Sequence, residues 1–313
     1  MNRRNSTEFK PLACPLESRD CPAAVVGLAA GHDRLRRDAK SVTHNLARIQ
    51  ATATTVPYQG DSQLLTIIKP TSTEPQQGWP ILFAIHGGGW YRFDRTEILA
   101  GLAGMPADSV AVVAPDYTLA RADKASWPDN INDLGRALDW VLEHGPEYGL
   151  DTTNITVMGQ SAGGHLAALL AIDESGRTDR SGGPLVDGLV SVSGPVNLPG
   201  LVRQSAFATG KAQTMLGASY KANPALWQAA SPAWLLQSDP KISMPPTLLI
   251  HGTADPLVPV DQSIAFDTLL EQRKVPVSLV QIDKAGHELL RGRTGKKVQA
   301  MILRFINGLS GSA

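Results

Sequence analysis

A serine between two glycines has the most distinctive chemical setting in this chain. Residues 157–164 read VMGQSAGG, so Gly159 lies two positions before Ser161 and Gly163 two positions after it. A serine on a tight turn from a strand into a helix takes a strained backbone, and the neighbouring chain has room only if both flanking residues are tiny. The pattern predicts that Ser161 is a nucleophile. The alternative is a glycine-rich turn without chemistry.

A serine hydroxyl attacks poorly unless a base takes its proton, and histidine is the usual base. Of the seven histidines, His287 is the best candidate, because the segment DKAGHELL follows the last apolar run of the chain. We expect His165, on the helix after the serine, to pack or cap. We expect His251 to hold a loop.

The imidazole in turn needs a carboxylate that fixes its tautomer and stabilises its positive form. Asp255 fits this role, since HGTADPLVP follows the apolar run TLLIHG, and the chain order becomes serine, aspartate, histidine. That order is expected for one hydrolase architecture among several. Asp261 and Asp283 are competing acids, although we expect Asp261 to begin a helix and Asp283 to end a strand.

A second glycine-rich segment, HGGGW at 86–90, could stabilise an oxyanion. Backbone N–H groups aimed at the developing charge do this in acyl transfer, and glycines let such a loop approach the substrate. We assign the donors to Gly88 and Gly89, joined by the N–H of Ala162 just after the nucleophile. We expect His86 to orient this loop through a hydrogen bond.

Aromatic side chains could line an acyl or alcohol pocket. We assign substrate contact to Trp90 and Tyr91, which follow the glycines directly. Further candidates are Trp127, Trp227 and Trp234, and for each of these aromatics packing in the core or lid is the alternative.

Short, continuous apolar runs alternate with helical stretches from residue 64 onward, where we expect the sheet to begin. The first run is QLLTIIKP, and the others occupy 79–85, 110–117, 154–160, 186–194, 247–252 and 277–283. Such runs are typical of parallel strands buried on both faces. The helical stretches lie at 127–145, 162–172, 260–274 and 294–309. The alternation predicts an α/β fold with a mostly parallel central sheet flanked by helices.

The domain organisation follows from these patterns. We expect residues 1–50 to form a leader with a helix over 33–50, and residues 51–313 to form the catalytic domain. Within it, 195–235 has no strand pattern and is interpreted as a small lid. Cys14 and Cys21 in the leader could form a disulfide or remain two thiols, depending on the compartment.

Composition narrows the classes of partner. Lysine plus arginine and aspartate plus glutamate each total 29, so no net charge favours nucleic acid. No apolar run approaches the ~18 residues needed to span a bilayer. We expect a cytoplasmic protein, with secretion as the alternative. The sequence is also compatible with a homodimer.

The four segments HGGGW, GQSAGG, HGTADPLVP and AGHE, in this order, resemble the α/β-hydrolase carboxylesterases of the hormone-sensitive-lipase-like and bacterial feruloyl-esterase-like groups. The likeness covers roughly residues 55–310. It implies the same roles for Ser161, Asp255 and His287 and the same oxyanion donors. Gln160 stands where the lipase-like group usually has aspartate, and the tryptophan after the glycines resembles feruloyl-esterase-like and kynurenine-formamidase-like members.

The resemblance implies hydrolysis of a small-molecule ester through an acyl-enzyme, with short-chain or small aromatic esters as substrates. It implies no metal and no organic cofactor. One alternative is a formamidase or amidase on the same fold. Another is a ligand-binding protein that has lost catalysis, although such a protein should lack a member of the triad.

Overall fold

The computed structural model describes residues 53–60, 62–103, 105, 109–179 and 181–310. The predicted leader, its helix over 33–50 and the pair Cys14 and Cys21 lie outside these residues. Among the described helices, none is long and apolar enough to cross a membrane.

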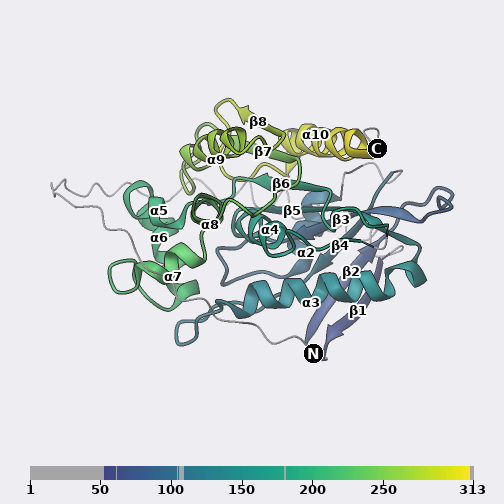
Figure 1. Cartoon of the computed structure of the whole chain (residues 1–313), viewed down its shortest axis with the longest axis horizontal. Helices are drawn as coiled ribbons and strands as arrows, with labels where there is room; N and C mark the ends of the chain where they lie inside the picture. The colour runs from purple at the N-terminus through teal and green to yellow at the C-terminus, as the bar shows by residue number, and fades with distance from the viewer. Residues whose placement is uncertain (1–52, 61, 104, 106–108, 180, 311–313) are drawn as a thin grey trace. The chain divides into compact units, whose positions relative to one another are not determined.

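Within the described residues, eight strands form one sheet in the order β1-β2-β4-β3-β5-β6-β7-β8 (Figure 1). The strands β1 to β4 are Ala53–Gln59, Gln63–Ile68, Trp79–Ile85 and Ala111–Pro115, and β5 to β8 are Leu150–Gln160, Gly188–Val192, Thr247–Gly252 and Val277–Ile282. Strand β2 pairs antiparallel with both β1 and β4, whereas β4, β3, β5, β6, β7 and β8 pair in parallel. The predicted mostly parallel sheet is confirmed.

The expected start of the sheet at residue 64 is wrong, because β1 precedes it. This strand has no buried residue and contains Pro57. An edge strand tolerates proline, since one side of its backbone needs no partner. A strand without a buried face lacks the apolar run by which the other strands are recognised.

Alternate residues of the strands pack against different helices. On β3, Ile81, Phe83 and Ile85 belong to one apolar core with α3, α4 and α9, while Leu82 and Ala84 belong to a second core with α2 and α10. Helices therefore cover both faces, as predicted. Their bounds are Arg95–Leu102 for α2, Asp129–His144 for α3, Ala162–Asp173 for α4, Asp261–Gln272 for α9 and Gly292–Ser310 for α10, with a short 3₁₀ helix η1 at Gly145–Tyr148.

Helix α2 was not expected from the sequence. It is eight residues long and begins at the side chain of Asp94, which accepts a hydrogen bond from the N–H of Thr96. Two turns are too short to display a repeating apolar stripe, so periodicity does not reveal it.

The segment interpreted as a lid folds into four short helices: α5 (Leu198–Gln204), α6 (Ala206–Leu216), α7 (Pro224–Ala229) and α8 (Pro232–Ser238). Proline in the first turn of α5, α7 and α8, and side-chain caps from Asn197, Ser205 and Asn223, explain why the segment breaks into pieces. In Figure 1, α5, α6 and α7 lie together at the left. Movement of this segment as a lid remains a prediction.

Candidate active site

The turn that carries Ser161 joins the end of β5 to the start of α4. Its backbone is strained, with φ 57° and ψ −122°, a region that non-glycine residues rarely occupy. A Cβ at Gly159 would collide with the backbone of Gly163, and a Cβ at Gly163 would collide with the carbonyl oxygen of Ile85. The expectation that both flanking residues must be tiny is therefore confirmed.

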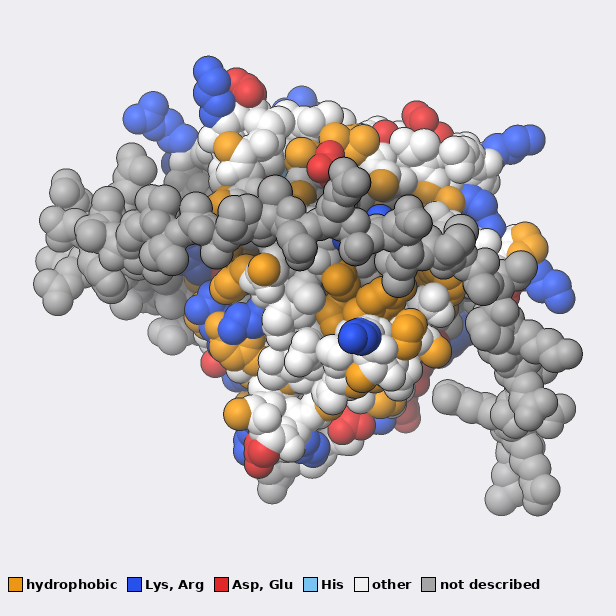
Figure 2. All heavy atoms as spheres, turned by 90° about the vertical axis from the view of Figure 1, so that its left-hand side faces the viewer, with side chains coloured by type: hydrophobic (Ala, Val, Ile, Leu, Met, Phe, Trp, Pro, Cys, Tyr) orange, Lys and Arg blue, Asp and Glu red, His pale blue; other side chains and the backbone are white. Residues whose placement is uncertain are grey.

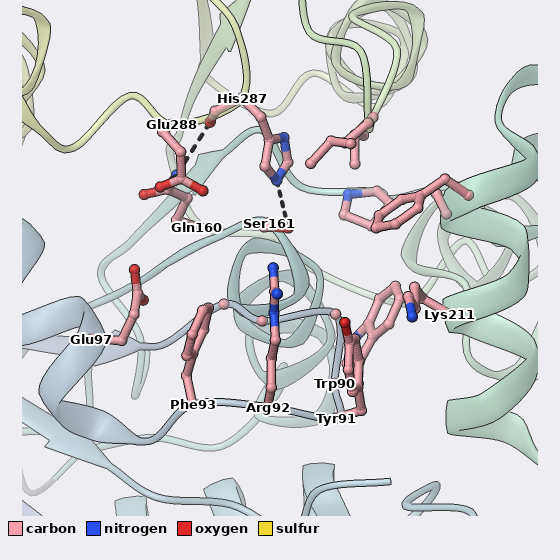
Figure 3. A pocket seen from close by; sticks show the side chains of 18 residues that line it. Trp90, Tyr91, Arg92, Phe93, Glu97, Gln160, Ser161, Lys211, His287 and Glu288 are labelled. Carbon is pink, nitrogen blue, oxygen red and sulfur yellow. Dashed lines mark hydrogen bonds between the residues drawn. The ribbon is translucent and has the colours of Figure 1, made fainter. Parts of the chain in front are cut away.

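Ser161, His287 and Asp255 meet at this turn, although they come from three distant segments. The Nε2 atom of His287 lies 2.7 Å from Ser161 Oγ (Figure 3). Its Nδ1 lies 2.7 Å from Asp255 Oδ2. The histidine follows β8 and the aspartate follows β7, so both come from the carboxyl edge of the parallel strands. The geometry is a continuous chain of hydrogen bonds from hydroxyl to carboxylate.

Asp255 is held as a carboxylate. Its Oδ1 accepts hydrogen bonds from the N–H groups of Leu257 at 2.8 Å and Val258 at 3.0 Å, and its Oδ2 lies 3.3 Å from Nε2 of His251. Burial alone would raise the pKa of Asp255, but hydrogen bonds from His251 and His287, the charge of His287 and the N–H of Val258 hold it well below its usual range. Because a carboxylate only accepts, Nδ1 of His287 carries the proton and Nε2 can accept from the serine.

The two competing acids lie elsewhere. Asp261 is the first residue of α9, and Asp283 follows β8 with its side chain 82% exposed, beside Lys284. Both match their expected places in the chain. His251 bonds Ser263 Oγ at 2.7 Å and the carbonyl oxygen of Val258 at 2.9 Å, which confirms that it holds the Asp255 loop.

The glycine segment after β3 lies against the serine turn. Gly88 and Gly89 have φ angles of 101° and 62°, and both line the pocket that contains Ser161. A Cβ at Gly87 would sit 2.9 Å from the carbonyl oxygen of Gln160. Ala162 is the first residue of α4, where backbone N–H groups have no partner within the helix. The assignment of the N–H groups of Gly88, Gly89 and Ala162 as oxyanion donors remains a prediction.

His86 and Tyr117 hold the glycine segment in place through hydrogen bonds and ring stacking. His86 Nδ1 donates to the Gly87 carbonyl oxygen at 2.8 Å, and its ring stacks on Tyr117 at 4.3 Å between centroids. The Tyr117 hydroxyl donates to the carbonyl oxygen of His86 at 3.0 Å. Burial lowers the pKa of His86 to about 4, so the ring is neutral at physiological pH. The expectation that His86 orients the loop is confirmed.

Trp90 and Tyr91 both line the pocket, whereas Trp127, Trp227 and Trp234 are not part of its described lining. Trp90 is only 2% exposed and donates its indole N–H to His165 Nδ1 at 3.2 Å. Trp227 is fully buried and donates to the Ala218 carbonyl oxygen. Of the two candidates that line the pocket, Tyr91 has the more exposed surface.

His165 packs, as expected, in the core behind the pocket. Its Nε2–H donates to the Ala230 carbonyl oxygen at 2.7 Å while Nδ1 accepts from Trp90, so both ring nitrogens are satisfied only in the neutral form. Burial lowers its pKa to about 4. An unfolded chain would instead take up a proton near pH 6.5.

This burial makes stability depend on pH. The stabilisation from neutral His165 is fully present above about pH 6.5 and is lost as the pH falls toward about 4, because the unfolded state binds the proton first. We expect the free energy of unfolding of His165→Gln, measured by urea titration, to fall between pH 7 and pH 5 by about 2 kcal/mol less than that of the unmodified chain. Other titrating groups contribute equally to both proteins and therefore cancel in the comparison. An equal loss of unfolding free energy in both proteins would contradict the neutral, buried state of His165.

Three polar residues on one side of the pocket were not assigned to it from the sequence. Gln160 Nε2 donates to the His287 carbonyl oxygen at 3.2 Å and to Glu288 Oε2 at 3.3 Å. Glu97 lies 3.3 Å from Arg291, and burial and the neighbouring Glu288 raise its pKa against the effect of Arg291. Gln160 and Glu288 adjoin Ser161 and His287 in the sequence, which is a usable signal. Glu97 lies on the unexpected helix α2 and has none.

Two cations and two aromatic rings were also missed: Arg92, Phe93, Phe207 and Lys211 line the pocket. Arg92 and Phe93 continue the glycine loop, and Phe207 and Lys211 come from α6. Among the described residues, no group of three or more histidine, cysteine, aspartate or glutamate side chains could hold a metal ion.

Comparison with known sequences finds esterases. The chain is 29% identical over 256 residues to Esterase LipQ of Mycobacterium tuberculosis, which covers 77% of this chain and 58% of that protein. It is 27% identical over 264 residues to Esterase LipC of the same organism, covering 80% and 64%. The chain thus spans less than two thirds of the length of either relative.

Comparison with solved structures supports the fold. Esterase B from Lactobacillus rhamnosis matches with a TM-score of 0.70 and 20% identity, over 88% of this chain and 95% of that one. A truncated carbohydrate esterase from gut microbiota matches with a TM-score of 0.67 and 22% identity, over 82% and 96%. The BD-FAE family model matches residues 65–270, which is more than half of the chain. With this match and this sheet, the chain belongs to the BD-FAE family and has the α/β-hydrolase fold.

Proposed function

We propose that this protein is a serine carboxylic-ester hydrolase that cleaves short-chain or small aromatic esters through an acyl-enzyme. The observation that carries the proposal is the pair of 2.7 Å hydrogen bonds that join Ser161 to His287, which both line one pocket, and His287 to Asp255 behind it. The esterases among its relatives and the family match support the same reaction class.

In the first half of the reaction, His287 Nε2 takes the proton of Ser161 Oγ as the oxygen attacks the ester carbonyl carbon. The carbonyl oxygen becomes an oxyanion, which the N–H groups of Gly88, Gly89 and Ala162 stabilise. The tetrahedral intermediate collapses as His287 returns the proton to the departing alcohol oxygen. An acyl group is then left on Ser161.

In the second half, water replaces the alcohol. His287 removes one proton from the water as its oxygen attacks the acyl carbon, and the same N–H groups stabilise the new oxyanion. Cleavage of the bond to Ser161 Oγ releases the carboxylic acid, and His287 returns the proton to the serine. Asp255 stabilises the imidazolium in both halves without taking a proton itself.

The pocket supports a small substrate. Its empty space of about 640 Å³ includes solvent at the open mouth, so the enclosed part is smaller and favours a small acyl or alcohol group. Tyr91, Phe93 and Phe207 provide aromatic walls on which a planar acyl group could stack.

A hydrolysis panel tests this function. We expect p-nitrophenyl acetate and butyrate to be cleaved with kcat/KM at least about tenfold above the decanoate, because a ten-carbon chain exceeds the pocket, and we expect a feruloyl ester to be accepted. An N-formyl amide of an aromatic amine belongs in the same panel. If only this amide is cleaved, the formamidase alternative replaces the esterase. If nothing is cleaved and an active-site phosphonate leaves Ser161 unlabelled, the ligand-binding alternative replaces the esterase.

A further inference from the structure

The pocket has an uncompensated positive side formed by Arg92 and Lys211, which we call the cation pair. Figure 3 shows Arg92 rising toward Ser161 from the loop after Trp90, with Lys211 of α6 beside Tyr91. Among the residues that the structure describes, neither side chain forms a salt bridge with a carboxylate. Both cations therefore face the reaction space with their charge available.

Aromatic rings hold the cation pair in place. The Arg92 guanidinium carbon lies 4.6 Å from the ring centroid of Phe93 and 5.6 Å from that of Tyr91. Lys211 Nζ lies 4.0 Å from the centroid of Tyr91 and 5.5 Å from that of Phe207. Contacts with ring faces position a cation without using its N–H groups. No hydrogen bond links these N–H groups to another described residue, so they can bind an anionic oxygen.

Phe93 adds an independent indication. Its φ is 72°, a conformation that is costly for a bulky side chain, yet its side chain is 50% exposed and gains little from burial. The ring instead lies against Gly88, where an added Cβ would be 2.8 Å from it, and under the guanidinium of Arg92. Backbone strain that is not offset by burial of the side chain is typical of functional sites.

The carboxylates of the pocket lie on the other side. Figure 3 shows Glu97 and Glu288 on the side of the pocket away from Lys211. Glu288 is bonded to Gln160, and Glu97 is paired with Arg291. An anionic substrate group is repelled from that side and attracted to the cation pair, so the pocket is polarised across Ser161. On the face that carries α5, α6 and α7, Figure 2 shows hydrophobic side chains close to lysine and arginine side chains.

We propose that the cation pair Arg92 and Lys211 binds a carboxylate carried by the ester substrate, so that the enzyme prefers esters with one free carboxylate over neutral esters of the same length. The guanidinium offers a planar fork that matches a carboxylate, and Lys211 supplies a second charge. This inference rests on the proposed esterase function. It names the class of ester that the site selects.

Matched pairs of esters test the preference. In one arm, the p-nitrophenyl monoester of glutaric acid, with the carboxylate on the acyl half, is compared with p-nitrophenyl valerate. In the other, the butyryl ester of 4-hydroxybenzoate, with the carboxylate on the alcohol half, is compared with the butyryl ester of 4-hydroxybenzamide. We expect kcat/KM to be about tenfold higher for the carboxylated ester in at least one arm, equivalent to ~1.4 kcal/mol, and the ratio to fall as salt is raised.

The double variant Arg92→Gln and Lys211→Gln should reduce that ratio to about one. The matched control is Arg121→Gln and Lys241→Gln, which removes the same two charges from exposed positions outside the pocket lining. The control should keep the ratio of the unmodified enzyme. A ratio near one in both arms of the unmodified enzyme, or an equal loss in both double variants, would overturn the proposal.

A binding measurement separates this proposal from the esterase function. Calorimetry with monomethyl glutarate on the Ser161→Ala protein needs no turnover and should give a dissociation constant about tenfold lower than after the further loss of Arg92 and Lys211. If no ester is cleaved but this difference is present, the proposed function fails and the anion site stands. If esters are cleaved but the two dissociation constants agree, the anion site fails.

Discussion

Replacing Ser161 by alanine should reduce kcat for p-nitrophenyl butyrate by about 10⁶-fold, to a rate supported only by binding and the oxyanion donors. The variant removes the Oγ atom that lies 2.7 Å from His287 Nε2, and with it the only route to an acyl-enzyme. No covalent intermediate can form, so a pre-steady-state burst of p-nitrophenol should also be lost. Stopped-flow absorbance and steady-state rates measure both effects.

The fold should survive this change. Alanine occupies the strained backbone at φ 57° no worse than serine, and the N–H of residue 161 keeps its bond to the Val192 carbonyl oxygen. Circular dichroism and urea titration check this. The matched control is Ser238→Ala on the exposed end of α8, which should leave kcat unchanged. A folded Ser161→Ala protein that retains more than about one percent of its rate would remove Ser161 as the nucleophile.

The positions of Ser161, Asp255 and His287 could be predicted from the sequence because the carboxyl ends of parallel strands lie at one edge of the sheet. Each follows an apolar run that forms a strand, and strands β5, β7 and β8 end at the same edge of the sheet. The glycines at 159 and 163 carried additional information, since a collision forbids any side chain there. Local steric need and sheet topology thus point to the same three side chains.

The substrate side of the pocket could not be derived in this way. Glu97 depends on a helix too short to show a period, and Lys211 and Phe207 depend on how α6 packs over the glycine loop. The Phe93 ring that lies against Arg92 belongs to a residue with a positive φ, which its residue type does not predict. The catalytic residues can be predicted from the sequence, because their positions follow from the order of strands and turns. The side chains at the rim of the pocket, which set specificity, cannot be predicted in this way.

The edge strand β1 was missed for a related reason. Its residues are half-buried or exposed, and Pro57 argues against a strand in the middle of a sheet. Its position is set by pairing with β2, in which Val56 lies opposite Leu65. Pairing between strands is a tertiary property, and it decides the state of a segment whose own pattern is weak.

Asp255→Asn should lower kcat by about 10⁴-fold while the protein stays folded. The reason is the orientation that the surroundings impose on the new amide. Oδ1 of residue 255 accepts hydrogen bonds from the N–H groups of Leu257 and Val258, so the asparagine must keep its oxygen there and turn its NH₂ toward His287. Nδ1 of His287 must then accept, the proton moves to Nε2, and Nε2 can no longer take the proton of Ser161.

The measurement is kcat for p-nitrophenyl butyrate across pH, with Asp283→Asn as the matched control. Both variants remove one carboxylate from a loop next to a strand, but only Asp255 touches His287, and Asp283 is exposed beside Lys284. Asp283→Asn should therefore keep the rate of the unmodified enzyme. At high pH the Asp255→Asn rate should rise, because hydroxide can replace the missing base. If Asp283→Asn is the damaging change and Asp255→Asn is not, the acid of the triad is Asp283, which in turn requires the segment after β8 to rearrange when substrate binds.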